Sequence, residues 1–219
     1  MTMFGTMRNV LWQVRHGPRL RRQKRRLKAL AAEPRRKIVI GSSGTAFDGW
    51  VSTDRQVIDL TRESTWWEYF PADSLDAILA EHVWEHLTAD QAVAAARTCY
   101  RFLKPGGYLR VAVPDGFHPD PQYVAGVRPG GSGAGADDHK VLYNHESFAA
   151  VFASVGFTVR LHEHFDRNGQ FHSADWSPAD GMIQRSKRYD SRNEGGRLVY
   201  TSVILDAVKP GTTADAVRS

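Results

Sequence analysis

The sequence predicts an α/β domain with a mostly parallel seven-stranded sheet, helices on both faces and a basic helical arm at its N-terminus. From residue 37 onward, short apolar runs alternate with helical patterns. The first run, KIVI, enters the glycine turn GSSG at 41–44, and the second run ends on Asp54. The residues before 37 carry a helical pattern with a strong excess of Lys and Arg.

The composition is that of a globular protein large enough to bury a core, since 42% of its 219 residues are hydrophobic and 24% are charged. The single cysteine, Cys99, excludes an intrachain disulfide and a zinc site with several cysteines. No apolar run approaches the roughly 20 residues of a membrane-spanning helix, and no secretory signal is recognisable. We therefore expect a cytoplasmic protein.

The net charge of +5 is unevenly distributed, because residues 1–37 carry +11 and the remainder carries −6. We expect a helix over 3–16, a break at Gly17-Pro18, and then a basic helix with a thin apolar stripe. Such an arm could pack on the domain or on a second subunit, as in a homodimer, or lie on anionic lipid at the inner membrane face. Nucleic acid is the least favoured partner, because the arm offers few stacking side chains. The expected division is an arm at 1–36, a domain at 37–211 and a flexible tail at 212–219.

The elements of the domain follow from apolar patterns and from capping residues. Thr88 and Asn144 are suitable N-caps for the two helices, and Gly156 ends the second. Two long connections, 114–143 and 166–197, stand out, and loops of this length either build a site or are disordered. We predict helices near 88–103 and 145–155, and strands near 37–41, 50–54, 57–60, 75–82, 107–113, 157–165 and 198–207.

The glycine turn indicates a ligand that carries ribose. Only residues 41–49 separate the first two strands, fewer than the dozen or so that a parallel crossover needs, so the crossover is degenerate or the strands are connected differently. Without a full helix to hold a pyrophosphate, NAD is a poor candidate. Asp54, at the tip of the second strand, would accept hydrogen bonds from ribose hydroxyls.

Two later stretches, FPADSLDAILAEHVWEHL (70–87) and YRFLKPGGYLRVAVPD (100–115), decide the class. With Asp76, His82, Glu85 and His86 in order before LKPGG (103–107), the chain resembles class I S-adenosylmethionine-dependent methyltransferases of the type-11-like group. The resemblance implies a Rossmann-like sheet and S-adenosylmethionine as cofactor. The second long connection, 166–197, which we call the late loop, is similar to the corresponding loops of members linked to polysaccharide and glycan biosynthesis.

The resemblance also implies the position of the cofactor across the carboxyl ends of the strands. Its methionine portion would lie on the glycine turn, its ribose on the acid of the second strand and its adenine beside the third strand, while the end of the fourth strand would face the reactive methyl group. Gly41, Ser42 and Gly44 would line the methionine portion, and Asp54 would bind the ribose. Asp59 and Leu60 would contact the adenine, and Glu81 and His82 would lie near the reactive methyl group.

A hydroxyl acceptor needs a base, and histidine is the usual one near neutral pH. We predict His139 or His145 as this base, with Asp115 and His82 as further catalytic candidates. The order of residues in HVWEH differs from that of zinc proteases and disfavours zinc, whereas Asp137 and Asp138 offer oxygen ligands that suit Mg²⁺. The predicted substrate-binding residues are Asp138, His139, Tyr143, Trp176, Arg185 and Arg188.

Aromatic and multi-donor side chains together suit a sugar, so we expect O-methylation of a saccharide hydroxyl. The alternatives are methylation of another small molecule at oxygen or nitrogen, and a catalytically silent cofactor-binding module docked through the arm. Methylation of nucleic acid is a weaker alternative.

Overall fold

A computed structural model describes residues 3–42 and 44–211, so the tail predicted at 212–219 lies outside the described residues. None of the helices within these ranges is long and apolar enough to cross a bilayer. The helices are α1 (Met3–Leu30), α2 (Ser64–Trp67), α3 (Ala89–Phe102), α4 (Pro121–Val127) and α5 (His145–Ala153), with 3₁₀ turns η1 (Trp84–His86), η2 (Ala136–Asp138), η3 (Pro178–Asp180) and η4 (Ser191–Gly196). The strands are β1 (Lys37–Ile40), β2 (Val51–Ser52), β3 (Leu75–Glu81), β4 (Leu103–Pro114), β5 (Thr158–Phe165), β6 (Phe171–Ser173) and β7 (Ser202–Val208).

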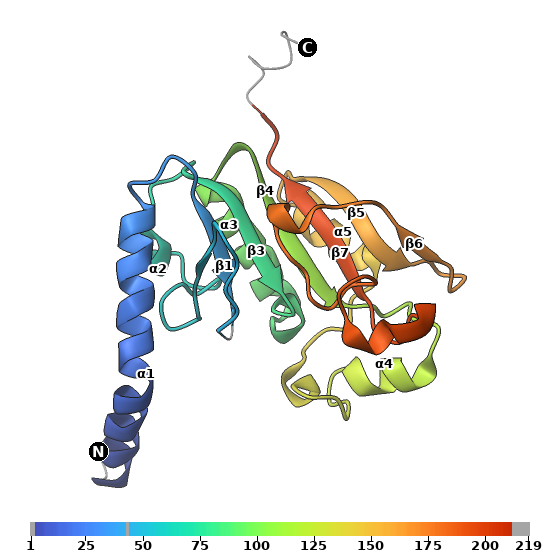
Figure 1. Cartoon of the computed structure of the whole chain (residues 1–219), viewed down its shortest axis with the longest axis horizontal. Coiled ribbons are helices and arrows are strands. Elements are labelled where there is room, and N and C mark those ends of the chain that lie inside the picture. The colour runs from blue at the N-terminus through green and yellow to red at the C-terminus, as the bar shows by residue number, and fades with distance from the viewer. Residues whose placement is uncertain (1–2, 43, 212–219) are drawn as a thin grey trace.

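The strands form one mixed seven-stranded sheet in the order β2-β1-β3-β4-β7-β5-β6, which confirms the α/β, Rossmann-like prediction (Figure 1). The pairs from β2 to β4 are parallel, and β7 and β6 run antiparallel to their neighbours. Strands β1 and β2 are parallel although a short turn joins them, so the crossover is degenerate.

One of the seven strands differs from the prediction. The segment 57–60 is not a strand, because the N–H groups of Val57 and Ile58 both donate to the carbonyl of Asp54 and turn the chain back on itself. The seventh strand is β6, which forms a hairpin with β5 inside the long connection 166–197. The predicted caps are confirmed, since Thr88 and Asn144 each form a capping box with the third residue of α3 and α5.

The two faces of the sheet are covered differently. Ile38 and Ile40 of β1 face a core shared with α1, α2, α3 and α5, whereas Val39 between them faces the opposite side. On that opposite side the cover comes from loop residues, among them Trp50, Trp176 and Ile183. The expected helices on both faces are thus replaced by loops on one, because the β1–β2 connection is too short to form a helix.

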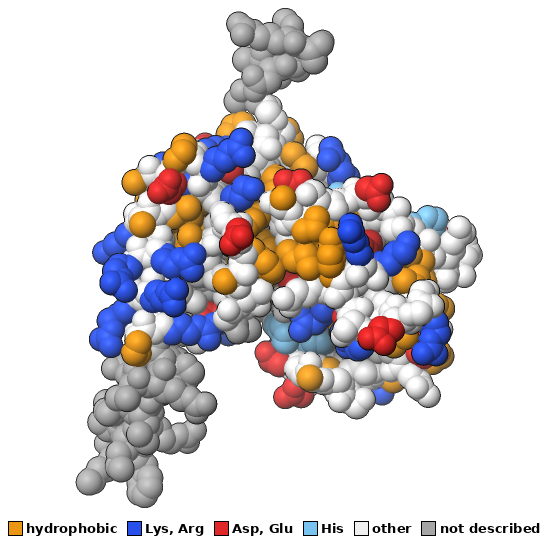
Figure 2. Space-filling model, viewed as in Figure 1, with side chains coloured by type: hydrophobic (Ala, Val, Ile, Leu, Met, Phe, Trp, Pro, Cys, Tyr) orange, Lys and Arg blue, Asp and Glu red, His pale blue; other side chains and the backbone are white. Residues whose placement is uncertain are grey.

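Helix α1 is continuous through Pro18, so the predicted break at Gly17-Pro18 is wrong. An internal proline removes one hydrogen bond and does not by itself end a helix. After Pro18, the side chains of Gln23, Leu27 and Leu30 are buried, and both leucines belong to the main core. The Lys and Arg side chains of this part of α1 cover its outer surface (Figure 2). Its C-terminal half therefore packs on the domain.

Candidate functional site

The carboxyl ends of β1, β2 and β3 lie side by side, because these strands are parallel neighbours. Gly41 directly follows β1, Asp54 lies two residues beyond β2, and His82 directly follows β3. The connections from β1 and from β3 leave on opposite sides here, and ligands of open α/β sheets bind at such a switch point. Three of the predicted cofactor residues, Gly41, Asp54 and His82, therefore lie at one edge of the sheet.

A cleft of about 480 Å³ opens at this edge and is the candidate cofactor cleft. Ile58, Leu60 and Val83 give it apolar walls, and Gly41 and Asp59 lie beside them. A flat aromatic base could pack between such walls with its polar edge toward Asp59. The cleft is completed by Ile40, Arg55, Thr61, His82, His86, Leu87, Gln91, Asp138 and Lys140.

Asp59 presents a hydrogen-bonded carboxylate to the cleft. Its Oδ1 accepts hydrogen bonds from the N–H of Thr61 at 2.9 Å and from the Thr61 hydroxyl at 2.7 Å. Burial opposes ionisation, but these hydrogen bonds and nearby Arg55 together lower the pKa of Asp59. Asp59 is therefore an ionised acceptor at neutral pH.

The glycine turn requires the absence of a side chain at Gly41. Its φ is +64°, and a Cβ there would lie 2.7 Å from Cγ2 of Val83. Beside the turn lies a smaller pocket of about 150 Å³, lined by Ser42 and Glu81 among others. The Glu81 carboxylate accepts the N–H of Arg185 at 2.7 Å, which fastens the late loop over the turn. Gly44 does not line the pockets described here.

Asp54 is engaged by the N-terminal arm. Its Oδ2 lies 2.7 Å from Nη2 of Arg19 and accepts a hydrogen bond from Nε2 of Gln23 at 2.8 Å. Ser42 Oγ lies 3.4 Å from Oδ1 of the same carboxylate. The carboxylate predicted to bind the ribose is thus already bound by two α1 side chains, and the sequence did not indicate either contact.

His82 lies at the junction of the cavities, because it lines the cofactor cleft, the pocket at the glycine turn and a third cavity. Its φ of +53° is unusual for a residue other than glycine and turns the chain sharply after β3. Nε2 lies 3.0 Å from Oγ of Ser202, whose hydroxyl donates to the carbonyl of Arg185. Nε2 is therefore the protonated nitrogen of the neutral ring.

The His82 ring has an uncharged neighbour at its other nitrogen. Nδ1 lies 3.2 Å from Oε1 of Glu85. Burial and the positive charge of Arg185 hold the pKa of His82 well below its usual value. Burial raises the pKa of Glu85 to about 8. Near neutral pH both side chains are neutral, so this contact is not an ion pair.

The third cavity has a volume of about 510 Å³ and is the candidate acceptor cavity. Its lining combines aromatic and hydrogen-bonding groups from α4, η1, η2 and the late loop. The lining residues are His82, Glu85, His86, Asp120, Gln122, Tyr123, Gly126, Val127, Gly133, Ala134, Ala136, His139, Arg185, Arg192, Val199 and Tyr200. Figure 2 shows histidine surface in the hollow between the sheet and the α4 lobe.

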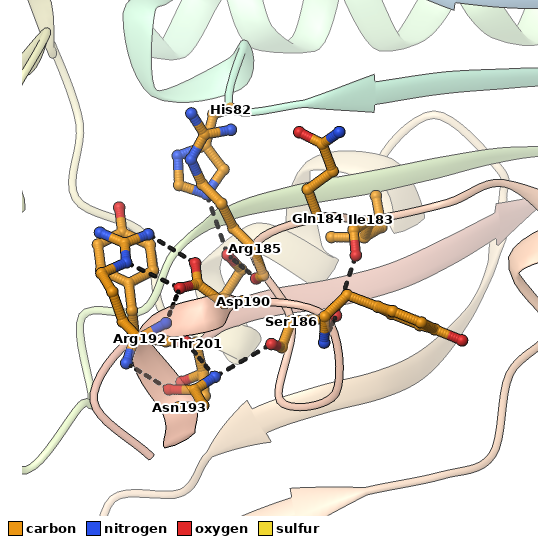
Figure 3. A network of polar contacts seen from close by, with 12 residues as sticks. His82, Ile183, Gln184, Arg185, Ser186, Asp190, Arg192, Asn193 and Thr201 are labelled. Carbon is orange, nitrogen blue, oxygen red and sulfur yellow. Dashed lines mark hydrogen bonds and ion pairs between the residues drawn. The ribbon is translucent and has the colours of Figure 1, made fainter. Parts of the chain in front are cut away.

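The late loop that forms one wall of this cavity is held by polar contacts (Figure 3). The side-chain amide of Asn193 donates to the carbonyl of Tyr200 at 2.7 Å, and its oxygen accepts the N–H of Tyr200 at 2.8 Å. The Arg192 guanidinium donates two hydrogen bonds to Asp190, at 2.8 and 2.6 Å, and lies 3.5 Å from the Tyr200 ring centre. In Figure 3 the side chain of Arg185 points toward His82.

Three side chains meet on the opposite wall of the cavity. One ligand-type atom from each of Glu85, His86 and His139 lies within 4.8 Å of the others. His139 Nδ1 lies 2.6 Å from the Val127 carbonyl, so Nδ1 donates and Nε2 keeps its lone pair. His139 is therefore the predicted base candidate that the structure brings to the acceptor cavity.

The other base candidate lies elsewhere. His145 Nδ1 donates to the carbonyl of Phe165 at 3.1 Å, and the ring packs on Phe117 and His164. Asp115 is fully buried, and its two oxygens accept the N–H groups of Phe117 and Phe165. Asp115 was predicted to be catalytic, but here its carboxylate joins the end of β4 to the end of β5, which is a structural position.

The predicted substrate-binding residues are divided among several places. Arg185 and His139 line the acceptor cavity, whereas Asp138 lines the cofactor cleft. Trp176 and Arg188 line a separate cavity of about 330 Å³ beside β6. Tyr143 is buried against Phe148, inside the core.

Sequence reasoning missed several residues of the site. Tyr123 and Tyr200 line the acceptor cavity, but their positions depend on how the two long connections fold. The available signal was an aromatic residue inside a long connection for Tyr123, and none for Tyr200, which lies in the strand predicted at 198–207. Nothing in the sequence indicated that Arg19 and Gln23 contact Asp54, because this contact depends on where α1 packs on the domain.

Comparison with known proteins gives one sequence match. The profile of the family described as "Methyltransferase domain" matches residues 55–111, from the turn after β2 to β4. No curated protein sequence matches the chain.

Three solved structures of low sequence identity are among those similar to the chain. A methyltransferase from Archaeoglobus fulgidus is 13% identical, with a TM-score of 0.45, over 92% of this chain and 99% of that chain. One from Mesorhizobium loti is 12% identical, with a TM-score of 0.46, over 84% and 96%. A chain of the complex between the Haloferax volcanii Trm112 methyltransferase activator and a methyltransferase is 14% identical, with a TM-score of 0.47, over 88% and 94%. At these scores none of them identifies an acceptor.

Proposed function

We propose that this chain is a class I S-adenosylmethionine-dependent methyltransferase that methylates a hydroxyl oxygen of a saccharide or glycan precursor. The observation that carries the proposal is the position of His82. Its ring forms part of the wall of both the cofactor cleft and the acceptor cavity. A methyl donor in the cleft and an acceptor in the cavity would therefore meet beside this residue.

The residues around the cleft and the glycine turn fit S-adenosylmethionine. Gly41 leaves the backbone of the turn open to a ligand, Ile58 and Leu60 offer apolar walls to a purine, and Asp59 is an acceptor beside them. Asp54 lines none of the cavities described here, so its proposed role with the ribose hydroxyls requires release of its carboxylate from Arg19 and Gln23. Bound S-adenosylmethionine would supply a methyl group activated by a positive sulfur, and the chain would supply position and acceptor activation.

The lining of the acceptor cavity supports a saccharide. Tyr123 and Tyr200 contribute aromatic groups to this lining, with one face of the Tyr200 ring covered by the Arg192 guanidinium and the Tyr123 ring stacked on His118. Gln122, Arg185 and Arg192 add hydrogen-bonding groups. Aromatic groups beside donors and acceptors suit the apolar and polar surfaces that a sugar offers.

We assign activation of the acceptor hydroxyl to the site around His139. Its Nδ1–H is fixed on the Val127 carbonyl, so the Nε2 lone pair is available on the cavity side, where Glu85 and His86 lie. A neutral imidazole held in one tautomer can take a proton as the carbon–oxygen bond forms. His145 has no comparable access, because its ring is packed among Phe117 and His164.

The test has two steps. Calorimetric titration with S-adenosylmethionine and S-adenosylhomocysteine should give binding in the micromolar range. Transfer of an isotope-labelled methyl group should then be measured over a set of saccharides, with amine and phenol acceptors as comparison. Preference for the saccharides supports the proposal, and transfer to amines or phenols alone would replace it with another small-molecule methyltransferase. Cofactor binding without transfer to any acceptor would favour a catalytically silent module.

A further inference from the structure

Glu85 is an unusual carboxylate for the interior of a protein. Its side chain is 1% exposed, and neither of its oxygens has a hydrogen-bond partner among the described residues. The nearby Nδ1 of His82, at 3.2 Å from Oε1, lacks hydrogen-bond alignment. Burying such a group without a partner is costly, so the position calls for a partner from outside the chain.

Two imidazole rings face this carboxylate. The rings of His86 and His139 have centroids 4.9 Å apart and are inclined at 78°. His139 is oriented by the Val127 carbonyl, 2.6 Å from Nδ1, whereas His86 Nδ1 lies 3.3 Å from Oδ2 of Asp138 without an aligned hydrogen bond. A carbonyl or carboxylate behind one ring nitrogen is the usual support of a metal-binding histidine, because it fixes the tautomer and orients the other nitrogen.

We propose that Glu85, His86 and His139 bind one divalent transition-metal ion of the zinc class at the wall of the acceptor cavity. Two imidazoles and one carboxylate are the ligand set of many catalytic zinc sites and of non-haem iron sites. Mg²⁺ prefers oxygen ligands throughout, so this set does not suit the Mg²⁺ expected from Asp137 and Asp138. One ligand-type atom from each side chain lies within 4.8 Å of the others, a spacing that a small inward shift would adapt to one ion.

The location gives the ion a role. All three ligands line the acceptor cavity, so the open coordination positions face the space for the acceptor. A hydroxyl oxygen bound there would lose its proton to water more readily, because the ion lowers its pKa. His139 then acts as a ligand and the ion activates the hydroxyl. This role rests on the proposed function, whereas the binding of the metal does not.

The first experiment measures metal binding alone. The full chain, freed of metal by dialysis against a chelator, is titrated with Co²⁺ while visible absorption is recorded. We expect one equivalent of Co²⁺ to produce intense bands typical of four or five ligands, Zn²⁺ to abolish them and excess Mg²⁺ to leave them unchanged. A spectrum that stays that of Co²⁺ in water would overturn the proposal.

Variants locate the site. His139→Gln and Glu85→Gln should each weaken Co²⁺ binding by at least about tenfold. His172→Ala, an exposed histidine on β6 paired with Asp166, is the matched control and should leave the titration unchanged. Equal affinity in His139→Gln and the original chain would contradict the assignment. Near-UV circular dichroism checks folding, and if Glu85→Gln fails to fold, His86→Gln takes its place.

The result is separate from the fate of the proposed function, because these titrations contain neither cofactor nor acceptor. Metal binding with no methyl transfer would retain the site and reject the saccharide reaction. Methyl transfer by a metal-free chain that shows no Co²⁺ bands would do the reverse.

Discussion

Arg19 Nη2 lies 2.7 Å from Asp54 Oδ2, so a side chain of α1 forms an ion pair with the acid at the tip of β2. Gln23 donates to the same oxygen at 2.8 Å. In the proposed cofactor site, the Asp54 carboxylate is the group expected to accept hydrogen bonds from the ribose hydroxyls. The arm and the cofactor would therefore compete for one carboxylate, and both sides of this competition can be measured.

Replacing Arg19 with Ala should tighten binding of S-adenosylhomocysteine by up to about fivefold, since a half-exposed ion pair contributes at most about 1 kcal/mol. Asp54→Ala should weaken it by about 10- to 100-fold, because the ribose loses charge-assisted hydrogen bonds. Calorimetry gives both affinities, and Arg21→Ala on the exposed side of α1 is the matched control. Weaker binding by Arg19→Ala would instead make the arm part of the cofactor site.

The two candidate bases can be separated by kinetics. His139→Gln should lower kcat by about 100-fold or more while the affinity for S-adenosylhomocysteine stays unchanged, because acceptor activation is lost and the cofactor cleft is untouched. His145→Ala should retain most of its turnover. The measurement is kcat at saturating cofactor, with calorimetry in parallel. A loss of turnover in His145→Ala alone would reverse the assignment.

Asp115 should behave as a structural residue. Asp115→Asn turns one acceptor into a donor that faces a backbone N–H, which should lower the free energy of unfolding by about 1–3 kcal/mol. Urea denaturation measures this loss, and activity of the folded fraction should be near normal. A variant as stable as the original chain but without turnover would restore the catalytic interpretation.

Glu85 should make the stability of the metal-free chain depend on pH. Its pKa is raised to about 8 from 4.5 by burial, so between these values the folded chain keeps a proton that the unfolded chain loses. The free energy of unfolding should therefore fall as pH rises from about 4.5 to about 8, by at most about 1.4 kcal/mol per unit, and level off above. Urea denaturation of Glu85→Gln should show a flatter profile than the original chain, whereas the exposed Glu68→Gln should not.

The second half of α1 should be essential for folding. Leu27 is fully buried in the main core, so Leu27→Ala should lower the free energy of unfolding by about 2–5 kcal/mol. The neighbouring Lys28→Ala, on the exposed side, should change it by less than about 0.5 kcal/mol. Equal effects in denaturation experiments would mean that the arm is only loosely attached.

The local parts of the fold could be predicted from the sequence. Apolar runs located β1, β3 and β4, and the capping residues Thr88 and Asn144 located the starts of α3 and α5, because these signals act over a few residues. The prediction of a strand at 57–60 was wrong because it relied on the same local apolar pattern. Its apolar pattern suits a strand, but Asp54 draws its amides into a turn, and pattern alone does not reveal that.

The candidate site was predictable where the sheet defines it. Gly41 and His82 directly follow strand ends, and the topology of an α/β sheet brings strand ends together. The acceptor side depends on the connections 114–143 and 166–197, whose folding rests on long-range contacts such as that of Asn193 with Tyr200. Trp176 and Arg188 have suitable chemistry for a sugar, yet the chain carries them to another cavity.

The sheet ends in two very short strands, β2 with two residues and β6 with three. Strand β2 is also packed against α1. A neighbouring molecule that tried to extend the sheet would find few free backbone groups at either border, and such truncated borders discourage uncontrolled association between copies. If the chain forms the homodimer considered from its sequence, its subunits should meet through helix or loop surfaces, and the catalytic sheet would remain confined to each subunit.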